Sequence, residues 1–191
     1  VQLLQDVSPL YPRAAPLDLS SLQPPLTASA GAGDSLTSED VNFQIYVGGI
    51  QYHVISGDLK TASKLLNAAR RAFGNSADLA ALTCHVENER GRRKACLKAC
   101  TASLELEFKV PDASWQAAAL SRVSTVLDAT NELNGAINAA RAALKIPDAM
   151  KDSTHVFRLI QLLGKRAACS DLDEAQQVLA DAAETLEPTH L

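Results

Sequence analysis

Small apolar residues recur at helical spacing in four separate stretches of the chain. Each stretch has an alanine, then an alanine or leucine four residues later, then another alanine three residues after that. Residues separated by four and by three positions lie on one face of an α-helix. The pattern therefore predicts four helices, each with a narrow apolar stripe. The stripes are Ala62/Leu66/Ala69, Ala95/Ala99/Ala102, Ala136/Ala140/Ala143 and Ala175/Leu179/Ala182.

Turn formers and helix terminators flank these four stretches. The turn formers that open them are Gly57, Gly91, Asn131 and Ser170, and the residues just beyond their ends are Gly74, Pro111, Pro147 and Pro188. Glycine and proline at these places are typical of helix ends. A further helical segment precedes each stretch, at about 41–56, 77–90, 113–129 and 153–169, and Thr37 with Asp40 predicts the N-cap of the first. The pattern indicates four antiparallel helix hairpins.

Alanine stripes allow helices to approach closely, near the lower end of the ~8–10 Å range of axis separations. Hairpins of this kind stack side by side, each burying its stripe on the next. The first alanines of successive stretches are separated by 33, 41 and 39 residues. We therefore predict an all-α superhelix (solenoid) of about four helix–turn–helix hairpins over residues 41–188.

Residues 1–40 differ in composition from the rest of the chain. They hold five of the eight prolines and end in a run rich in Gly, Ser, Thr and acidic residues. Because proline disrupts both helices and sheet ladders, we predict an extended N-terminal arm. Its apolar residues, Leu10 and Tyr11 among them, are candidates for docking on this chain or on a neighbouring subunit.

The hairpin pattern resembles the tetratricopeptide repeat. That family has a Gly-Asp/Asn-aromatic turn followed by Ala-x3-Phe-x2-Ala and a closing proline; here the turns read GDL, GRR, NEL and SDL, and the alanine triplets follow. The first helices lack the family's usual Trp and Tyr, and two of the three spacings exceed its length of about 34 residues. An alanine-rich α-hairpin solenoid outside the family is the structural alternative.

The resemblance implies a binding groove lined by the exposed side of the first helices. This lining would be small, polar and nearly free of cations, which argues against a receptor for acidic chaperone tails. The groove positions are Gln44, Val47, Gln51, Val54, Asp78, Ala81, His85, Asn88, Ala118, Ser121, Thr125, Asp128, Phe157, Ile160 and Gly164. The candidate partner-binding residues are Gln51, Val54, His85, Asn88, Thr125 and Asp128 from the groove, with Leu10 and Tyr11 from the arm.

Charge is distributed unevenly along the chain. Residues 1–40 have one Arg and five acidic residues, whereas residues 41–191 have 17 basic and 17 acidic residues. A neutral body without a basic excess argues against nucleic acid as a partner. No apolar run reaches the roughly 18–20 residues that cross a bilayer, so we expect no membrane insertion.

Cys84, Cys96, Cys100 and Cys169 form neither a CxxC pair nor a recognised disulfide framework. We expect reduced, buried thiols, and hence a reducing intracellular compartment, either the cytoplasm or an organellar matrix. Because the sequence starts at Val1, the possibility that a targeting peptide was cleaved before it stays open. Cys96 and Cys100 lie one turn apart, so with Cys84 and His85 a zinc site is conceivable, but small residues at a helix interface explain them better.

No catalytic motif is visible in the sequence. The histidines form neither HxxxH nor HExxH, no serine lies in GxSxG, and the GAGD at 31–34 does not join a strand to a helix. We expect no enzyme activity and no cofactor. The sequence favours a non-catalytic protein–protein interaction or scaffold subunit of a hetero-oligomeric complex. The alternatives are a reversible peptide-binding adaptor and a helical metal-binding protein or enzyme that uses Cys84, Cys96 and Cys100.

Overall fold

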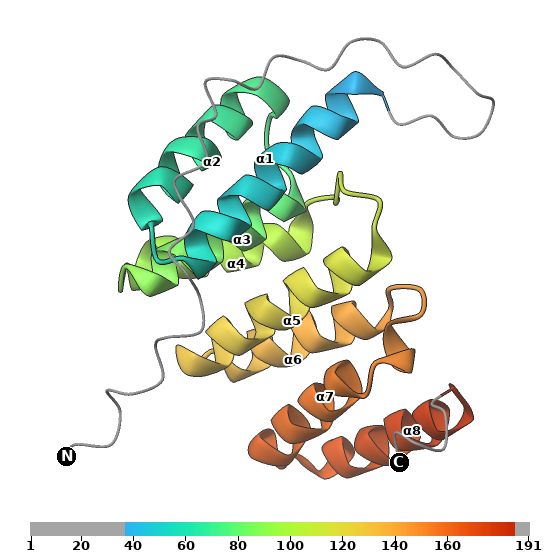
Figure 1. Cartoon of the computed structure of the whole chain (residues 1–191). Helices are drawn as coiled ribbons and strands as arrows, with labels where there is room; N and C mark the ends of the chain where they lie inside the picture. Colours follow the sequence, from blue (N-terminus) through green and yellow to red (C-terminus); the bar gives the residue numbers. More distant parts are fainter. Residues whose placement is uncertain (1–36, 186–191) are drawn as a thin grey trace, which may run out of the picture. The chain divides into compact units, whose positions relative to one another are not determined.

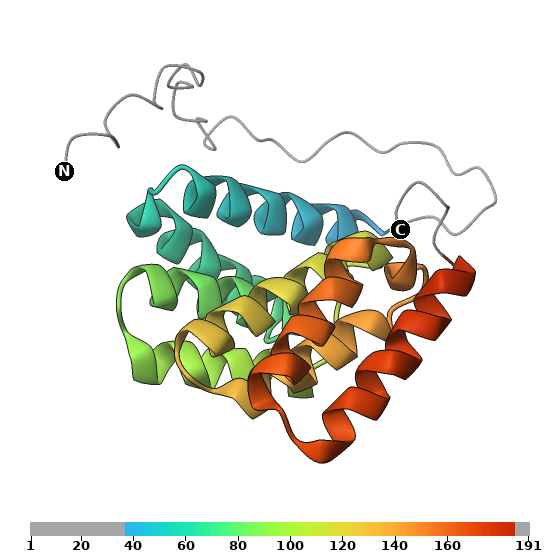
Figure 2. The same ribbon diagram turned by 90° about the horizontal axis from the view of Figure 1, so that it is seen from below.

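A computed structural model describes residues 37–185 of the chain, and all regular secondary structure in this range is helical (Figure 1, Figure 2). The chain divides into two units, residues 1–35 and 36–191, and every described helix belongs to the second. The helices are α1 (Ser38–Ile55), α2 (Leu59–Phe73), α3 (Ala77–Glu89), α4 (Arg93–Glu105), α5 (Ala113–Ala129), α6 (Leu133–Leu144), the 3₁₀ turn η2 (Ala149–Lys151), α7 (Ser153–Arg166) and α8 (Cys169–Thr185). The prediction of an all-α chain is confirmed for this range.

Four helix hairpins follow one another along the chain. The pairs are α1 with α2, α3 with α4, α5 with α6 and α7 with α8, and each pair is in close contact. Neighbouring hairpins also meet: α3 contacts α1 and α5, and α7 contacts α5 and α6. Sequential packing of this kind is the superhelical, repeat-like arrangement that the sequence predicts. The first helices, α1, α3, α5 and α7, therefore succeed one another on one face of the stack (Figure 1).

Helix ends follow the predicted turn chemistry in three hairpins and depart from it in the fourth. The predicted capping box is present, with Thr37 and Asp40 bonded reciprocally at the start of α1. Gly57, Gly91 and Asn131 adopt positive φ values of 79°, 68° and 62° in the tight turns within their hairpins. The prediction that Ser170 opens the last turn is wrong: Ala167 adopts φ 52° there, and Ser170 lies inside α8.

Two of the four apolar stripes are buried as predicted. Ala62, Leu66 and Ala69 of α2 and Ala136, Ala140 and Ala143 of α6 are all buried in the core. The alanine methyl groups in these stripes let each second helix pack closely against its hairpin partner.

The stripe on α4 is displaced by one residue. Ala95 is exposed, and the buried residues are Cys96, Ala99, Cys100 and Ser103. The segment has two overlapping frames of small residues, and the frame with the two larger, more apolar cysteines faces the core.

On α8 the predicted stripe is only partly buried. Leu179 is 43% exposed, whereas Ala182 is buried and Val178 packs against the core. This helix packs mainly against α7, so one side of it is enough to cover its neighbour.

A disulfide joins Cys84 of α3 to Cys100 of α4, which corrects the expectation of reduced thiols. Cys96 and Cys169 are free, the first buried and the second exposed. Antiparallel helices bring residues 16 positions apart face to face across the hairpin, a pairing that CxxC motifs do not reveal. The sequence argument for a reducing compartment rested on free thiols, so the disulfide removes it.

Candidate functional site

Two hollows in the described part of the chain lie on the face formed by the first helices. One, which we call the Arg122 crevice, is small, with about 20 Å³ of free space. The other, the Phe157 hollow, is open and has about 670 Å³. The Arg122 crevice is lined by Gln51, Val54, Ile55, Ala81, Leu82, His85, Trp115, Ala119 and Arg122. The Phe157 hollow is lined by Ser121, Thr125, Thr154, Phe157, Arg158, Ile160 and Gln161.

The predicted groove residues are distributed over both hollows. Gln51, Val54 and His85 line the Arg122 crevice, and Thr125 lines the Phe157 hollow. Asp128 lies beside that hollow and bonds to one of its lining residues, Arg158. Asn88 is half-buried and lines neither hollow. Leu10 and Tyr11 lie outside the described residues.

Asp78, which the sequence places in the groove, is instead fully buried beneath it. Its carboxylate accepts one hydrogen bond from the indole Nε1 of Trp115 and one from the backbone N–H of Lys109, both at 2.8 Å. Asp78 is the second residue of α3, where the helix dipole favours a negative charge. The hydrogen bond from Nε1 anchors the indole of Trp115, and Trp115 packs against both large core clusters.

Arg122 lies two turns after Trp115 on α5, and its guanidinium covers the indole ring at 5.1 Å from the centroid. Its Nε donates to the carbonyl of Ala118 at 3.2 Å. Among residues 37–185, no carboxylate lies within ion-pair distance of Arg122. Burial lowers the pKa of the guanidinium, but an arginine stays protonated at neutral pH. The crevice thus has a half-buried positive charge that no carboxylate of residues 37–185 neutralises.

His85 shares the Arg122 crevice. Burial lowers the pKa of its imidazole, and the charge of Arg122 lowers it further, against the opposite effect of Glu89. Glu89 is the nearest acid, with an oxygen 3.8 Å from Nε2 of His85. A depressed pKa keeps this imidazole neutral at pH 7, so Arg122 supplies the positive charge of the crevice.

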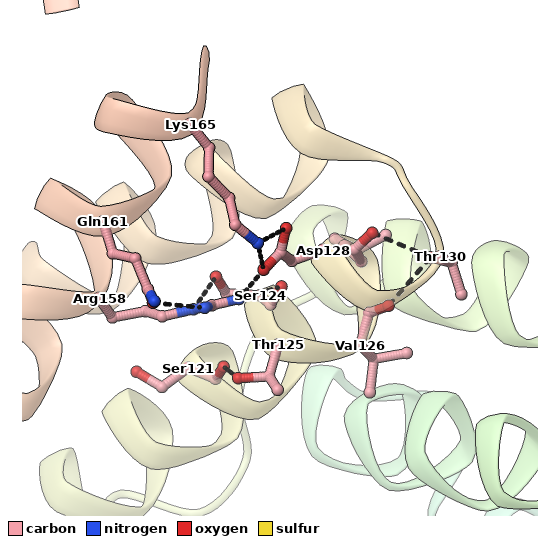
Figure 3. Close-up of polar contacts among 10 residues, drawn as sticks. Ser121, Ser124, Thr125, Val126, Asp128, Thr130, Arg158, Gln161 and Lys165 are labelled. Carbon is pink, nitrogen blue, oxygen red and sulfur yellow. Dashed lines mark hydrogen bonds and ion pairs between the residues drawn. The ribbon is translucent and has the colours of Figure 1, made fainter. Parts of the chain in front are cut away.

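The arginine of the Phe157 hollow is arranged differently (Figure 3). Arg158 donates to the carboxylate of Asp128 at 3.2 Å and to the backbone carbonyl of Ser124 at 3.2 Å, and Lys165 donates to the same carboxylate at 2.8 Å. Burial by itself would raise the pKa of Asp128, but the hydrogen bonds from Lys165 and Arg158 outweigh it and lower that pKa. Arg158 is therefore bound within the chain, while Phe157 is 54% exposed as the apolar surface of the hollow.

The two arginines correct the expectation of a groove nearly free of cations. Counting along α5 and α7 finds residues that point straight out of the face, such as Ser121 and Thr125. It misses long side chains that reach the face from a neighbouring position. A signal for Arg122 existed in the sequence, since it follows the only tryptophan of the chain by seven residues, or two helical turns.

Ser121, His155 and Asp152 have the composition of a catalytic triad. The Ser121 hydroxyl lies 2.6 Å from Nδ1 of His155, and Nε2 of that ring lies 3.7 Å from Asp152. Ser121 sits in the middle of α5, where the neighbouring backbone N–H groups are engaged in helical hydrogen bonds. Backbone donors for an oxyanion are therefore missing around this hydroxyl, and we interpret the contact as a link between α5 and α7.

Three buried cysteines bring potential metal-ligating atoms close together. The Sγ atoms of Cys84, Cys96 and Cys100 all lie within 4.8 Å of one another, and the last two are 3.9 Å apart. The disulfide leaves Cys96 as the free thiol of the three, and burial raises its pKa, with a further contribution from Glu87. A thiol that resists ionisation in a core of small apolar residues is a poor metal ligand.

Comparisons with known proteins leave the chain without an assigned family. It matches no protein-family model, and no curated protein is significantly similar to it in sequence. Across the described part of the chain, no helix is both long enough and apolar enough to cross a bilayer. The chain is thus an all-α protein whose eight main helices in residues 37–185 pack as sequential, repeat-like hairpins.

Proposed function

We propose that the chain is a non-catalytic protein-interaction subunit of the tetratricopeptide-like kind, which binds a segment of a partner protein along α1, α3, α5 and α7. The Phe157 hollow carries this proposal. A hollow of about 670 Å³ with an exposed phenylalanine is large enough for one or two apolar side chains of a partner. A groove across neighbouring helices suits an extended or helical segment.

Selection of random 12-residue peptides displayed on phage, against the full chain, tests this proposal. We expect enriched peptides whose binding falls at least about tenfold in Phe157→Ala, because an aromatic anchor in a hollow contributes most of the binding energy. Leu172→Ala is the matched control, since Leu172 is also a large exposed apolar residue but lies on α8. Selected peptides that all bind Phe157→Ala as well as the wild type would overturn this proposal.

The alternative of a reversible peptide adaptor is separated from an assembly subunit by the N-terminal segment. Removing residues 1–36 leaves the Thr37 cap of α1 in place. An assembly subunit that uses the arm loses incorporation into its complex, whereas an adaptor keeps its affinity for the selected peptides. Elemental analysis of the purified chain addresses the metal-binding alternative.

A further inference from the structure

We propose that Arg122 and Trp115 form a binding site for a carboxylate side chain, Asp or Glu, within the partner segment. This inference rests on the proposed function and adds to it the chemistry that the segment must have. Arg158 and Lys165 are bonded to Asp128, so their charges are already matched within the chain. Arg122 has no such partner among the residues that the structure describes.

Charge complementarity favours a carboxylate at Arg122. The Nε of Arg122 is engaged by Ala118, and no hydrogen bond from either terminal nitrogen to a described residue is found. Those nitrogens present a planar pair of donors, the geometry that suits the two oxygens of a carboxylate. Because the guanidinium is partly desolvated, a carboxylate that reaches it replaces few waters and meets a lower dielectric than at an exposed arginine.

The size of the Arg122 crevice also suits a carboxylate. The Arg122 crevice has about 20 Å³ of free space, slightly more than one water molecule requires. The carboxylate at the end of an Asp or Glu side chain is small enough to reach such a space from the rim of the crevice. Apolar walls from Val54, Ile55 and Leu82 surround the position, so the residue that enters needs apolar neighbours.

The path of the bound segment determines which kind of carboxylate can reach Arg122. The crevice opens between Ile55, which is 74% exposed on α1, and α5, which also lines the Phe157 hollow. A segment that runs from the Phe157 hollow on α5 and α7 to Ile55 on α1 passes Arg122 on α5 with chain on both sides. This favours the side chain of an internal residue over a terminal carboxylate, because a terminal carboxylate would end the chain at the crevice.

The site is also rigid before any ligand arrives. Asp78 holds the indole of Trp115, and the indole in turn supports the guanidinium of Arg122. Because these donors are held in place beforehand, they lose little conformational entropy when a ligand binds, which favours a specific polar contact.

Titration of the full chain with two tripeptides tests the inference directly. The probes are N-acetyl-Leu-Glu-Leu-amide and its neutral counterpart N-acetyl-Leu-Gln-Leu-amide. Because the chain has a single tryptophan, its indole N–H signal in a ¹⁵N–¹H spectrum is assigned without ambiguity and reports on the surroundings of Trp115 in this crevice. We expect a saturable shift of that signal with the Glu peptide and at least tenfold weaker binding of the Gln peptide.

Arg122→Gln is the decisive variant, and Arg71→Gln is its matched control. Arg71 has the same local bond, from its Nε to the carbonyl four residues earlier at 3.2 Å, but is exposed on α2. We expect Arg122→Gln to abolish the preference for Glu over Gln and Arg71→Gln to preserve it. Equal shifts with both peptides, or an unchanged preference in Arg122→Gln, would overturn the inference.

The phage selection separates failure of this inference from failure of the proposed function. Peptides without Asp or Glu that require Phe157 but bind Arg122→Gln normally would leave the function standing and overturn the carboxylate site. Absence of any Phe157-dependent peptide would overturn the function itself. Selected peptides that need a free C-terminal carboxylate would also count against the inference, and amidation of that terminus detects them.

Discussion

The Arg122 crevice and the Phe157 hollow lie on the same face, yet their arginines have different bonding partners. Arg158 is bonded to Asp128 and Ser124 from the neighbouring helix, so its charge stabilises the contact between α5 and α7. Arg122 contacts an aromatic ring and one carbonyl of its own helix, and has no acid in the described chain. Two similar residues on adjacent first helices thus have different roles, one in packing and one available for a ligand.

The comparison shows that position on a helix does not determine what a charged side chain is for. A guanidinium that is paired with a carboxylate of its own chain has already lost the water that hydrated it, so a ligand would have to displace that carboxylate. A guanidinium without one keeps its capacity for a new ion pair. Substitutions at the two hollows test this distinction, beginning with Asp78 beneath the Arg122 crevice.

The largest effect is expected from Asp78→Ala. The change removes the carboxylate that accepts from the indole N–H of Trp115 and the backbone N–H of Lys109. The Phe157 hollow is not touched by it. Losing hydrogen bonds to a buried charged acceptor should lower the free energy of unfolding by about 2–4 kcal/mol. Urea denaturation measures it, with the exposed Asp181→Ala on α8 as control. A loss no larger than in the control would mean that the indole is held by packing alone.

Asp128→Ala should have the next largest effect, on the side of the Phe157 hollow. It leaves Arg158 largely buried without its carboxylate, which should lower the free energy of unfolding by about 1–3 kcal/mol. Asp173→Ala, at an exposed position on α8, is the control. Equal stability of the two variants would show that Arg158 is satisfied by Ser124 and water.

Acid should weaken the same contact. The pKa of Asp128 is lowered in the folded chain, so its contribution is complete above the ordinary carboxyl pKa of about 3.9 and is lost as the pH falls through the lower, folded value. Asp128→Asn removes this contribution at every pH. The difference in unfolding free energy between wild type and Asp128→Asn should therefore shrink from pH 5 to pH 2. A constant difference would contradict the assignment.

Arg122→Met should have a small effect on stability. It removes a partly desolvated charge and also the cation–π contact with Trp115, which is worth about 0.5–1 kcal/mol, so we expect a change below about 1 kcal/mol. Arg158→Met, the matched substitution, should be more destabilising because Asp128 loses a partner. If Arg122→Met is the more destabilising of the two, Arg122 has a structural role and the distinction fails.

The smallest expected effect is on the titration of His85. Its folded pKa is lowered, so the neutral imidazole is favoured and the associated stability is lost as the pH falls below the ordinary value of about 6.5. Removing the nearby charge in Arg122→Gln should raise the pKa of His85, and removing the attraction of Glu89 in Glu89→Gln should lower it. NMR titration of the imidazole measures both, and a pKa that is unchanged in Arg122→Gln would place the two groups too far apart to interact.

The helices and their pairing followed from the sequence because the signals were local. Alanines at helical spacing defined α2 and α6, and Gly57, Gly91 and Asn131 marked the turns in which a positive φ is needed. Each hairpin contacts mainly its neighbours, so local patterns are enough to predict the stacking.

Features that depend on which of two possible helix faces is buried could not be predicted from local patterns. The stripe of α4 had two overlapping frames, and only packing against α3 selects the frame of Cys96 and Cys100. The Cys84–Cys100 disulfide needs the same register to be known first. Arg122 reaches the candidate site because its side chain is long and stacks on the anchored ring of Trp115. Asp78 is buried and does not line the groove, because that indole and the backbone N–H of Lys109 donate its two hydrogen bonds.

Sequential packing has a consequence for how the chain would respond to a ligand. The first and last hairpins make no substantial contact with each other, so each end can fray while the central hairpins stay folded. A segment that spans Ile55 on α1 and Phe157 on α7 would connect elements that otherwise communicate only through their neighbours. Such a bridge would couple the melting of the two ends, so that protection from hydrogen exchange would rise at sites the ligand never touches.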